Sequence, residues 1–512
     1  MIADELTYRI RGAFGFEPTS EQQQAIDVFA TFMADSRMMP VMVMRGSAGT
    51  GKTTLAAAIV RGLRSLEQQL VLLAPTGRAA KVFSLYADCA AYTIHRRIYR
   101  QKSLEGGFEL GYNNAKDTLF IVDEASMISL NGEGRSLLDD LISYVYNGRN
   151  CRLMLIGDQA QLPPVGEEES PALMAPVLRS FGLHVYECTL NEVLRQSQES
   201  GILWNATEVR WLMYEGTVPS VSSEANYRGT VPHVHLPKVL LQGFTDIHVV
   251  PGDELIETLA SSYSKVGLDE TMVVTRSNKR ANIFNQGIRN QILGREEELT
   301  TGDRLMVVKN NYSLTGLTSL TPGPSPKGEG SFRGEGNSKG EGSDVRAMEF
   351  IANGDMCVVR KVRNVHEQYG FRFAEVTVTF PDYDDYELTA TVLLDTLTSE
   401  APALTRDQQE TLYNKVLEDY ADIPRKSDRM KALKEDRYYN ALQVKYAYAA
   451  TCHKAQGGQW AHIYVDQGYM TDDMLSVDYL HWLYTAFTRA TEQLYLINWP
   501  KAQIARRFAS EE

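Results

Sequence analysis

The sequence predicts an α/β protein with two doubly wound cores, each of which is built on a parallel sheet. In the first half, short apolar runs at residues 41–44, 70–74, 119–122 and 153–156 are each followed by a polar or turn-rich segment. Such runs are typical of parallel strands that are buried on both faces and carry functional loops at their carboxyl ends. Helical patterns, as at 53–66, lie between them.

The same alternation returns in the second half of the chain. Runs at 272–275 and 494–497 have the composition of strands, and 278–293 has the spacing of an amphipathic helix. We therefore expect a first core at residues 1–240 and a second core at 241–512.

An insertion of about residues 353–445 interrupts the second core. Its front part, at 356–365 and 371–380, is β-branched and aromatic with turn residues between, which indicates short strands. Its rear part, at 405–443, is charged and has a helical pattern. We expect a small β-barrel followed by helices.

Residues 313–345 are predicted to belong to neither core. Within this insert, Gly, Pro, Ser, Lys and Glu dominate, and a Lys-Gly-Glu-Gly-Ser pattern recurs as a loose repeat. This composition buries too little apolar surface to offset chain entropy, so the insert is predicted to be disordered. A strand-binding role is less favoured, because each positive charge has a glutamate nearby.

The bulk composition fits globular domains, with 43% apolar and 23% charged residues among 512. No apolar run reaches the roughly 18 residues of a membrane span, and the chain does not start like a secretory signal. Five scattered cysteines fit a reducing cytosol, so a cytoplasmic location is expected. The net charge of −13 argues against broad coating of duplex DNA, although a local groove can still hold a strand.

A glycine-rich loop follows the first apolar run and fits the phosphate-binding P-loop pattern in full. Backbone N–H groups of such a loop cradle phosphates, Lys52 neutralises phosphate charge, and the Thr53 hydroxyl binds magnesium. A chance glycine-rich turn is the weaker alternative. ATP and Mg²⁺ are the predicted ligands. The predicted nucleotide-binding residues here are Gly46, Ser47, Ala48, Gly49, Thr50, Gly51, Lys52, Thr53 and Thr54.

Two later strands also end in polar residues. Asp123 and Glu124 follow the run at 119–122; we expect Asp123 to hold magnesium and Glu124 to orient and deprotonate the attacking water. A strand that ends in Asp-Glu is also a common helix N-cap, but the P-loop upstream favours the catalytic interpretation. The run at 153–156 leads to Gln159, which we interpret as a sensor of the nucleotide rather than part of a plain surface turn.

These motifs resemble those of superfamily-1 DNA helicases of the RecD-like and Dda-like branch, over nearly the whole chain apart from the insert. The resemblance implies two RecA-like P-loop NTPase cores. It also implies a small hairpin at about 97–116 in the first core and an SH3-like β-barrel in the second. An ordinary surface hairpin is an almost equal alternative for 97–116. The further motifs that carry the resemblance lie at 19–22, 74–81, 93–95, 190–196, 446–457 and 484–490.

The resemblance assigns roles to residues in these motifs. Gln22 would read adenine, Gly457 would join the nucleotide site, and Arg195 and Arg489 would touch the γ-phosphate, where an always-ionised, forked donor suits transition-state charge. Lone arginines on helices are normally solvated and lone histidines normally structural, so motif context carries these assignments. The implied catalytic set is Lys52, Glu124, Gln159, Arg195 and Arg489. The implied nucleic-acid-binding set is Thr76, Arg78, Thr93, His95, Thr451, His453 and Lys454.

The resulting expectation is a monomeric, strand-stimulated ATPase that acts as a DNA helicase on single-stranded and tailed duplex DNA. The form of the motif at 453–457 and the compact hairpin resemble the branch that moves 5′→3′, with roles in repair, recombination or replication. Two alternatives stay open: an RNA helicase of the same superfamily, and an ATP-binding switch or scaffold that separates no strands. No clustered nuclease motif is present outside the ATP site, so nuclease activity would require a partner.

Overall fold

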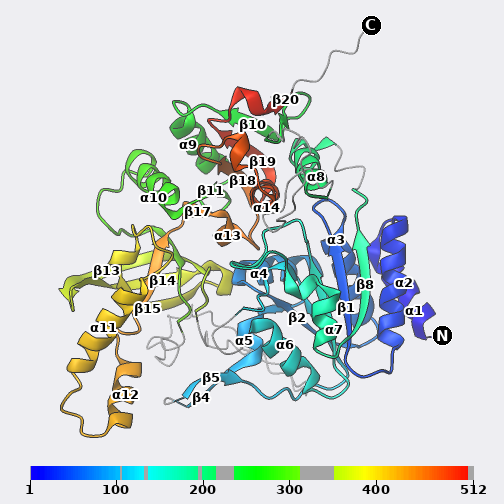
Figure 1. Ribbon diagram of the computed structural model, residues 1–512, viewed down its shortest axis with the longest axis horizontal. Helices are drawn as coiled ribbons and strands as arrows, with labels where there is room; N and C mark the ends of the chain where they lie inside the picture. The colour runs from blue at the N-terminus through cyan, green and yellow to red at the C-terminus, as the bar shows by residue number, and fades with distance from the viewer. Residues whose placement is uncertain are drawn as a thin grey trace, which may run out of the picture. The chain divides into compact units, whose positions relative to one another are not determined.

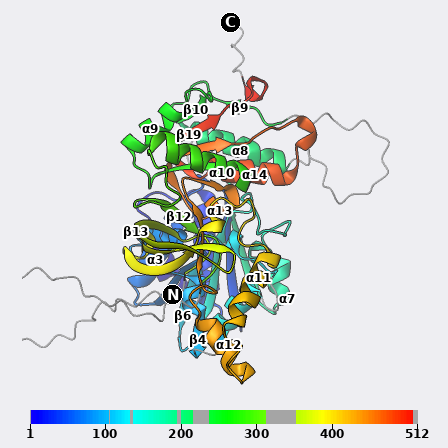
Figure 2. The ribbon, with the colours of Figure 1, turned by 90° about the vertical axis from the view of Figure 1, so that its left-hand side faces the viewer.

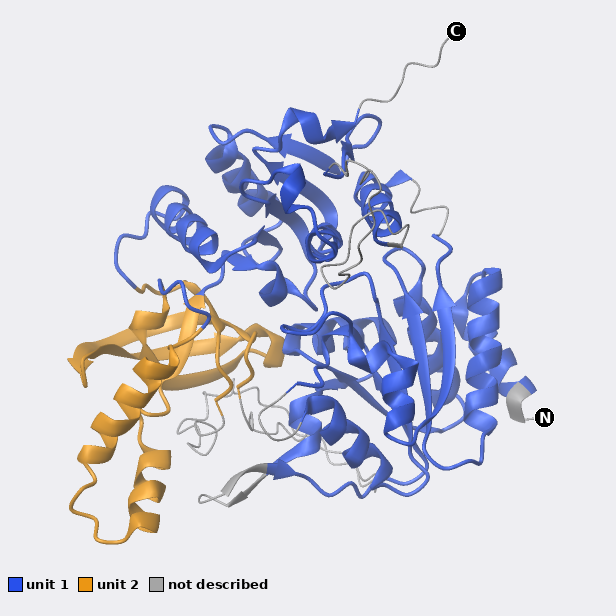
Figure 3. Ribbon diagram, in the orientation of Figure 1, with its two compact units in different colours: residues 1–298, 398–402, 446–512 blue, residues 299–397, 403–445 orange. Residues whose placement is uncertain are grey.

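The chain divides into two compact units (Figure 3). The computed structural model describes residues 2–103, 106–131, 136–193, 199–214, 236–311 and 351–505. The first unit comprises Met1–Glu298, Thr398–Pro402 and Tyr446–Glu512, and the second comprises Leu299–Leu397 and Ala403–Lys445. The predicted disordered insert at 313–345 and the predicted catalytic Arg195 lie outside the described residues.

The first core, within the first unit, is built on a six-stranded sheet in the order β3-β2-β6-β7-β1-β8, with every pair parallel (Figure 1). Its strands are β1 (Pro40–Gly46), β2 (Gln69–Ala74), β3 (Ala91–Thr93), β6 (Thr118–Val122), β7 (Arg152–Gly157) and β8 (His184–Leu190). Leu153 of β7 pairs with Val41 on one side and Phe120 on the other. The carboxyl ends of β6, β7 and β1 therefore lie side by side, which brings their polar loops together.

Helices cover both faces of this sheet. In β1, Met42 and Met44 pack into an apolar cluster with α1, α2 and α3, whereas Val41 and Val43 pack into a second cluster with α5, α6 and α7. This alternation is expected of a strand buried on both faces. The helices are α1 (Ile2–Phe14), α2 (Ser20–Ala34), α3 (Lys52–Arg64), α4 (Gly77–Ala87), α5 (Ile94–Ile98), α6 (Leu137–Tyr146) and α7 (Ala175–Ser180). Strands β4 (Tyr99–Ser103) and β5 (Gly106–Leu110) form an antiparallel hairpin inside the predicted 97–116.

The second core, also within the first unit, has a five-stranded parallel sheet in the order β10-β19-β18-β11-β17. Its strands are β10 (Ile247–Val250), β11 (Thr271–Thr275), β17 (Ala449–Thr451), β18 (Trp460–Asp466) and β19 (Ala490–Ile497). Its helices are α9 (Leu255–Lys265), α10 (Asn278–Gly287), α13 (Cys452–Ala455) and α14 (Val477–Phe487). The predicted helix at 278–293 is present as α10 and a π-helical turn, Ile288–Ile292.

Helix α8 (Gly201–Tyr214) packs against α14, and the two lie side by side in both views (Figures 1 and 2). A short parallel pair, β9 (Val239–Leu240) and β20 (Ile504–Ala505), completes this unit. None of the helices in the described ranges is long and apolar enough to cross a membrane.

The second unit is a closed five-stranded barrel with two helices. The strands are β12 (Arg304–Val307), β13 (Met356–Gln368), β14 (Phe371–Phe380), β15 (Tyr386–Leu393) and β16 (Leu442–Tyr446). The helices α11 (Arg406–Glu418) and α12 (Lys426–Glu435) pack through Leu412 and Leu433 against Phe371 and Phe373. The predicted fold class, two parallel-sheet cores and a barrel insertion, is therefore confirmed. The barrel also includes β12, which precedes the predicted start of the insertion at 353. This strand belongs to the barrel because it pairs with β13, which follows the intervening chain.

Candidate active site

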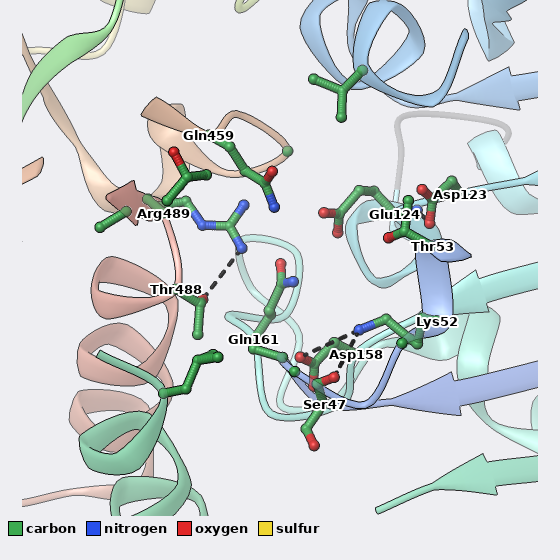
Figure 4. A pocket seen from close by; sticks show the side chains of 18 of the residues that line it. Ser47, Lys52, Thr53, Asp123, Glu124, Asp158, Gln161, Gln459, Thr488 and Arg489 are labelled. Atoms are coloured by element: carbon green, nitrogen blue, oxygen red, sulfur yellow. Dashed lines mark hydrogen bonds and ion pairs between the residues drawn. The ribbon is translucent and has the colours of Figure 1, made fainter. Parts of the chain in front are cut away.

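A cavity of about 410 Å³ in the first unit brings both cores together (Figure 4). Its walls include Ser47, Ala48, Gly49, Gly51, Lys52, Thr53 and Thr54 from the P-loop, and Asp123, Glu124, Asp158 and Gln161 from the neighbouring strand ends. The second core contributes Gly457, Gln459, Thr488 and Arg489. Most of the predicted nucleotide residues, and several of the predicted catalytic ones, thus share one space.

The P-loop has the backbone geometry that a phosphate cradle needs. Gly49 and Gly51 have φ values of 78° and 81°, a left-handed conformation that glycine adopts without steric cost. A Cβ atom at Gly46 would lie 2.6 Å from Cγ of Lys52, so a side chain there would displace the lysine. Helix α3 begins at Lys52, and its first N–H groups form the kind of N-terminus that binds anions. Gly46 does not line the cavity itself.

Lys52 is the first residue of α3, and its ammonium group makes two long contacts. Its Nζ donates to the Ser47 carbonyl at 3.3 Å and lies 3.9 Å from Oδ2 of Asp158. Neither contact is a tight ion pair, so the ammonium can serve a phosphate ligand without breaking a strong bond.

The predicted magnesium and water-activating residues lie together at the end of β6. Figure 4 shows Thr53, Asp123 and Glu124 on one side of the cavity. Glu124 has a φ of 54°, which is uncommon for a residue with a side chain and is found at functional sites. Burial, and then the neighbouring Glu124 carboxylate, raises the pKa of Asp123. A crowded carboxylate pair beside a hydroxyl is an oxygen-rich donor set that suits Mg²⁺.

The glutamine that faces the cavity is Gln161 and not the predicted Gln159. Oε1 of Gln161 is buried and has no hydrogen-bond partner within the described residues. Gln159 lines a separate cavity of about 240 Å³ together with Met213 and His481. The turn is set by the Asp158 carboxylate, which accepts from the Ala160 N–H at 3.0 Å. Both glutamines follow β7 closely, so their spacing in the sequence did not distinguish them.

Arg489 reaches the cavity from the second core, whose strand β19 begins at the next residue. It is 2% exposed, and its guanidinium donates to the carbonyls of Thr485 and Gly458, each at 3.1 Å. A further bond of 3.3 Å joins it to Oγ1 of Thr488. These bonds orient the permanently charged guanidinium toward the cavity that the P-loop lines.

Gln22 does not line the cavity. Its Nε2 donates to the Thr50 carbonyl at 3.0 Å, and its Oε1 accepts from the Thr19 N–H at 3.0 Å. The second bond belongs to the capping box that begins α2. Both polar groups of the Gln22 amide are therefore hydrogen-bonded within the fold, and the bond to the Thr50 carbonyl supports the P-loop. Thr50 itself is 1% exposed and is also absent from the cavity wall.

None of the seven predicted nucleic-acid-binding residues lines this cavity. Thr76 and Thr93 cap α4 and α5, and their hydroxyls accept from the N–H groups of Ala79 at 3.2 Å and Arg96 at 3.3 Å. Burial lowers the pKa of His95 to about 4, which keeps that side chain neutral at neutral pH.

Arg78 bridges the two cores instead of standing free. It donates to the Gln459 carbonyl, lies 3.5 Å from Oε1 of Glu270, and stacks 4.6 Å from the centre of the Trp460 ring. Nearby, Oγ1 of Thr76 lies 3.2 Å from where a Cβ on Gly457 would be.

The remaining members of the strand-binding set lie on the second core. Thr451 precedes α13, while His453, which is exposed, and Lys454, which is partly exposed, lie on it.

Two residues that contact the P-loop were not among those predicted from the sequence. Arg210, from α8, is 6% exposed and its guanidinium contacts the Ser47 hydroxyl. Tyr484, from α14, contacts Ala48 and Asp158. Tyr484 begins the motif at 484–490, so its position was a usable signal. Arg210 is a single arginine on an ordinary helix, so its sequence context gave no signal of this contact.

Two regions of the chain match known protein families. A family model described as "AAA domain" matches residues 18–227, and one described as "UvrD-like helicase C-terminal domain" matches residues 446–497. The ATP-dependent DNA helicase dda of Enterobacteria phage T4 is 28% identical over 292 residues, which are 54% of this chain and 58% of that protein. The ATP-dependent RecD2 DNA helicase of Deinococcus radiodurans is 35% identical over 131 residues, 24% of this chain and 16% of that protein.

The chain is therefore similar to superfamily-1 helicases of the Dda- and RecD-like group. The chain spans less than two thirds of the length of each of the two relatives named above. Among solved structures, a Pif1 helicase from Bacteroides with ADP-AlF3 and single-stranded DNA is 15% identical; the alignment covers 96% of this chain and 95% of that chain, with a TM-score of 0.38. Pif1 helicases at forked duplex DNA give a TM-score of 0.43, at 15% identity over 96% of this chain and 95% of that chain.

Proposed function

We propose that this chain is an ATP-driven DNA helicase that hydrolyses ATP to move along a single strand. The observation that carries the proposal is the shared cavity: the P-loop and the Asp123–Glu124 pair of one sheet line it together with Arg489 of the other core. Phosphoryl transfer requires a phosphate cradle, a residue that positions water and a cation at the γ-phosphate, and the cavity wall offers a candidate for each. A nucleotide held between two cores links its hydrolysis to their separation.

Each polar group at the cavity has a task in this proposal. Lys52 and the N–H groups at the start of α3 bind the phosphates, and Glu124 orients and deprotonates the attacking water. Thr53 and Asp123 would hold Mg²⁺, which when bound neutralises phosphate charge. Arg489 stabilises the charge that develops on the γ-phosphate, with Arg195 as a second candidate for that task.

Gln161 replaces Gln159 as the proposed nucleotide sensor. The Gln161 side chain lines the cavity. The next residue contacts the second core, because the Leu162 N–H donates to Oγ1 of Thr485 at 2.8 Å. A change at the γ-phosphate can therefore reach α14 through one short loop.

The proposed strand track rests on the family resemblance and on the similarity to the two DNA helicases. We propose that Thr451, His453 and Lys454 on the second core bind the strand, with the motif at 74–81, which includes Thr76, contributing from the first core. The substrates are single-stranded DNA and duplexes with a 5′ single-stranded tail, and the chain acts as a monomer. The five free cysteines agree with work in a reducing cytosol.

The proposal is tested by ATPase rates with and without defined DNA and RNA strands. A DNA helicase should show turnover that rises at least about tenfold with single-stranded DNA and less with RNA. Preference for RNA would assign the chain to the RNA helicases, and nucleotide binding without strand-stimulated turnover would make it a switch or scaffold.

Direction is tested separately, with two partial duplexes that differ only in which end carries the tail. We expect unwinding of the 5′-tailed duplex, which corresponds to 5′→3′ movement. Unwinding of the 3′-tailed duplex alone would place the chain in the other branch of the superfamily.

A further inference from the structure

Tyr484 joins three parts of the nucleotide site, and the proposed function assigns it no task. It lies on α14 and is 1% exposed. Its hydroxyl accepts from the Ala48 N–H of the P-loop at 2.8 Å and donates to Oδ2 of Asp158 at 2.6 Å. One hydroxyl of the second core thus satisfies two groups of the first.

The carboxylate that Tyr484 contacts is also close to the P-loop lysine. Oδ2 of Asp158 lies 3.9 Å from Nζ of Lys52, while the other carboxylate oxygen accepts from the Ala160 N–H at 3.0 Å. Asp158 is only 2% exposed, so an unsatisfied oxygen there would be costly and would seek a cation. Lys52 is a cation within ion-pair distance of this carboxylate.

We propose that the Tyr484 hydroxyl keeps Asp158 from pairing closely with Lys52 and so reserves the Lys52 ammonium for the phosphates of ATP. Tyr484 is a positioning residue in this view, since it acts through Asp158 and does not touch the phosphates. The inference rests on the proposed function, because it takes Lys52 as the residue that binds those phosphates.

The surroundings of Tyr484 keep its hydroxyl in the role of donor. Burial, and then the negative charge of Asp158, raises the pKa of Tyr484 well above its usual value, so the hydroxyl stays protonated. An ionised phenolate could not donate to a carboxylate.

The neighbours of Tyr484 on α14 hold the same loop. Nδ1 of His481 bonds the Ala160 carbonyl at 2.9 Å, and Thr485 accepts from the Leu162 N–H at 2.8 Å. When α14 moves away from this loop, the Tyr484 hydroxyl leaves Asp158 free to attract Lys52. Separation of the cores would then lower ATP affinity directly, which links movement to nucleotide exchange.

The test is a titration of a fluorescent, non-hydrolysable ATP analogue with Mg²⁺ into the full chain, with folding checked by circular dichroism. Tyr484→Phe should weaken binding about tenfold, the size expected when a buried hydrogen bond to a charged group is lost. Adding Asp158→Asn to that chain should restore the affinity to within about twofold of Asp158→Asn alone. Asp158→Asn alone should bind no more weakly than the wild type, because it removes the competing charge.

Tyr479→Phe is the matched control. It removes a buried hydroxyl from the same helix, one that donates to Oε1 of Gln467 at 2.7 Å and touches nothing at the P-loop. Its affinity for the analogue should stay within about twofold of the wild type, as additivity between separate sites predicts.

Three results would overturn the inference: wild-type affinity in Tyr484→Phe, an undiminished loss when Asp158→Asn is also present, or weaker binding by Asp158→Asn alone. A wild-type chain that does not bind the analogue would overturn the proposed function as well. These outcomes are distinct, because the first three require a wild-type chain that binds.

Discussion

The predicted nucleotide residues and the predicted strand-binding residues differ in how the fold uses them. Most of the nucleotide set faces one cavity, whereas Thr76 and Thr93 serve as helix caps, Arg78 stacks on Trp460, and His95 is half-buried. Phosphate binding relies on backbone N–H groups in one short loop, so contiguous residues encode it. Strand binding is spread over many weak contacts on several loops. Motifs therefore specify the first function locally and only indicate the second.

Lys52→Ala should separate the two functions most strongly. We expect ATP turnover to fall to background because the phosphate charge loses its cation, while affinity for single-stranded DNA stays within about threefold. ATPase assays and fluorescence anisotropy with a labelled oligonucleotide measure the two effects on the same preparation. An equal loss of both in a folded protein would show that nucleotide and strand sites are not separate.

Arg489→Ala should have the next largest effect. Hydrolysis should slow by about 10³-fold or more, as for other arginines at a transferred phosphate, with ATP affinity changed only a few fold. Single-turnover kinetics and analogue binding distinguish these effects. Arg280→Ala is the control: that guanidinium pairs with Asp466 at 2.7 and 2.9 Å in the same core and lies outside the cavity wall. A wild-type rate of hydrolysis in Arg489→Ala would show that Arg489 does not act at the γ-phosphate.

Gln161→Ala and Gln159→Ala form a matched pair two positions apart. The loss of a donor that acts in the transition state costs about 10²-fold in rate, and we expect that loss for Gln161→Ala only. Strand-stimulated ATPase rates give the comparison. If Gln159→Ala lowers the rate more, Gln159 is the nucleotide sensor, and a position in the cavity wall does not identify that sensor.

Arg78→Ala addresses the strand-binding set. Since Arg78 stacks on Trp460 and donates to Gln459, we expect a loss of about 1–2 kcal/mol in unfolding free energy. We also expect no change in the salt dependence of strand binding. A residue that contacts a phosphate would instead reduce the slope of log affinity against log salt by about 0.7 for a single strand. A change of that size would return Arg78 to the strand track.

Asp355→Asn, in the barrel, should affect neither function and change only stability. Burial raises the pKa of Asp355 from 3.8 to about 7, while its carboxylate accepts from the Ala352 N–H at 2.7 Å and the Tyr383 hydroxyl at 2.8 Å. The folded chain therefore keeps a proton that the unfolded chain loses, so stability falls as pH rises from about 4 to about 7.

The expected slope is on the order of 1 kcal/mol per pH unit, and Asp355→Asn should flatten it. Urea unfolding at several pH values in that window measures the change. ATPase activity per folded molecule should match the wild type. An unchanged pH profile would show that Asp355 is ionised in the folded chain.

The parts of the fold that the sequence predicted well are those set by local pattern. Short apolar runs located the strands β1, β2, β6 and β7 of the first core and β11 and β19 of the second, and the P-loop spacing located one wall of the cavity. Long-range pairing was not predictable in this way. The strand β12 is four residues long and pairs with β13 only after the intervening chain, so nothing in its own composition assigned it to the barrel.

Side-chain direction was the other limit. Gln159 and Gln161 are equally plausible by position, and the turn after β7 decides which one faces the cavity. Gln22 was assigned to the base, but a capping box and the Thr50 carbonyl occupy its amide. These choices depend on hydrogen bonds to distant backbone atoms, which single-sequence patterns do not contain.

The barrel has a built-in place for length variation. The backbones of Asn311 and Ile351 exchange two hydrogen bonds, of 2.8 and 2.9 Å, at the two ends of the stretch 312–350. This pair fastens the two ends together, and the entropic cost of closing a loop between them rises by only about 0.6 kcal/mol for each doubling of the loop length. A longer connection between these two residues therefore adds little to the entropic cost of closing the loop. For the protein engineer, the same position is a graft point at which a fluorescent reporter or an affinity module can be carried without redesign of the strands on either side.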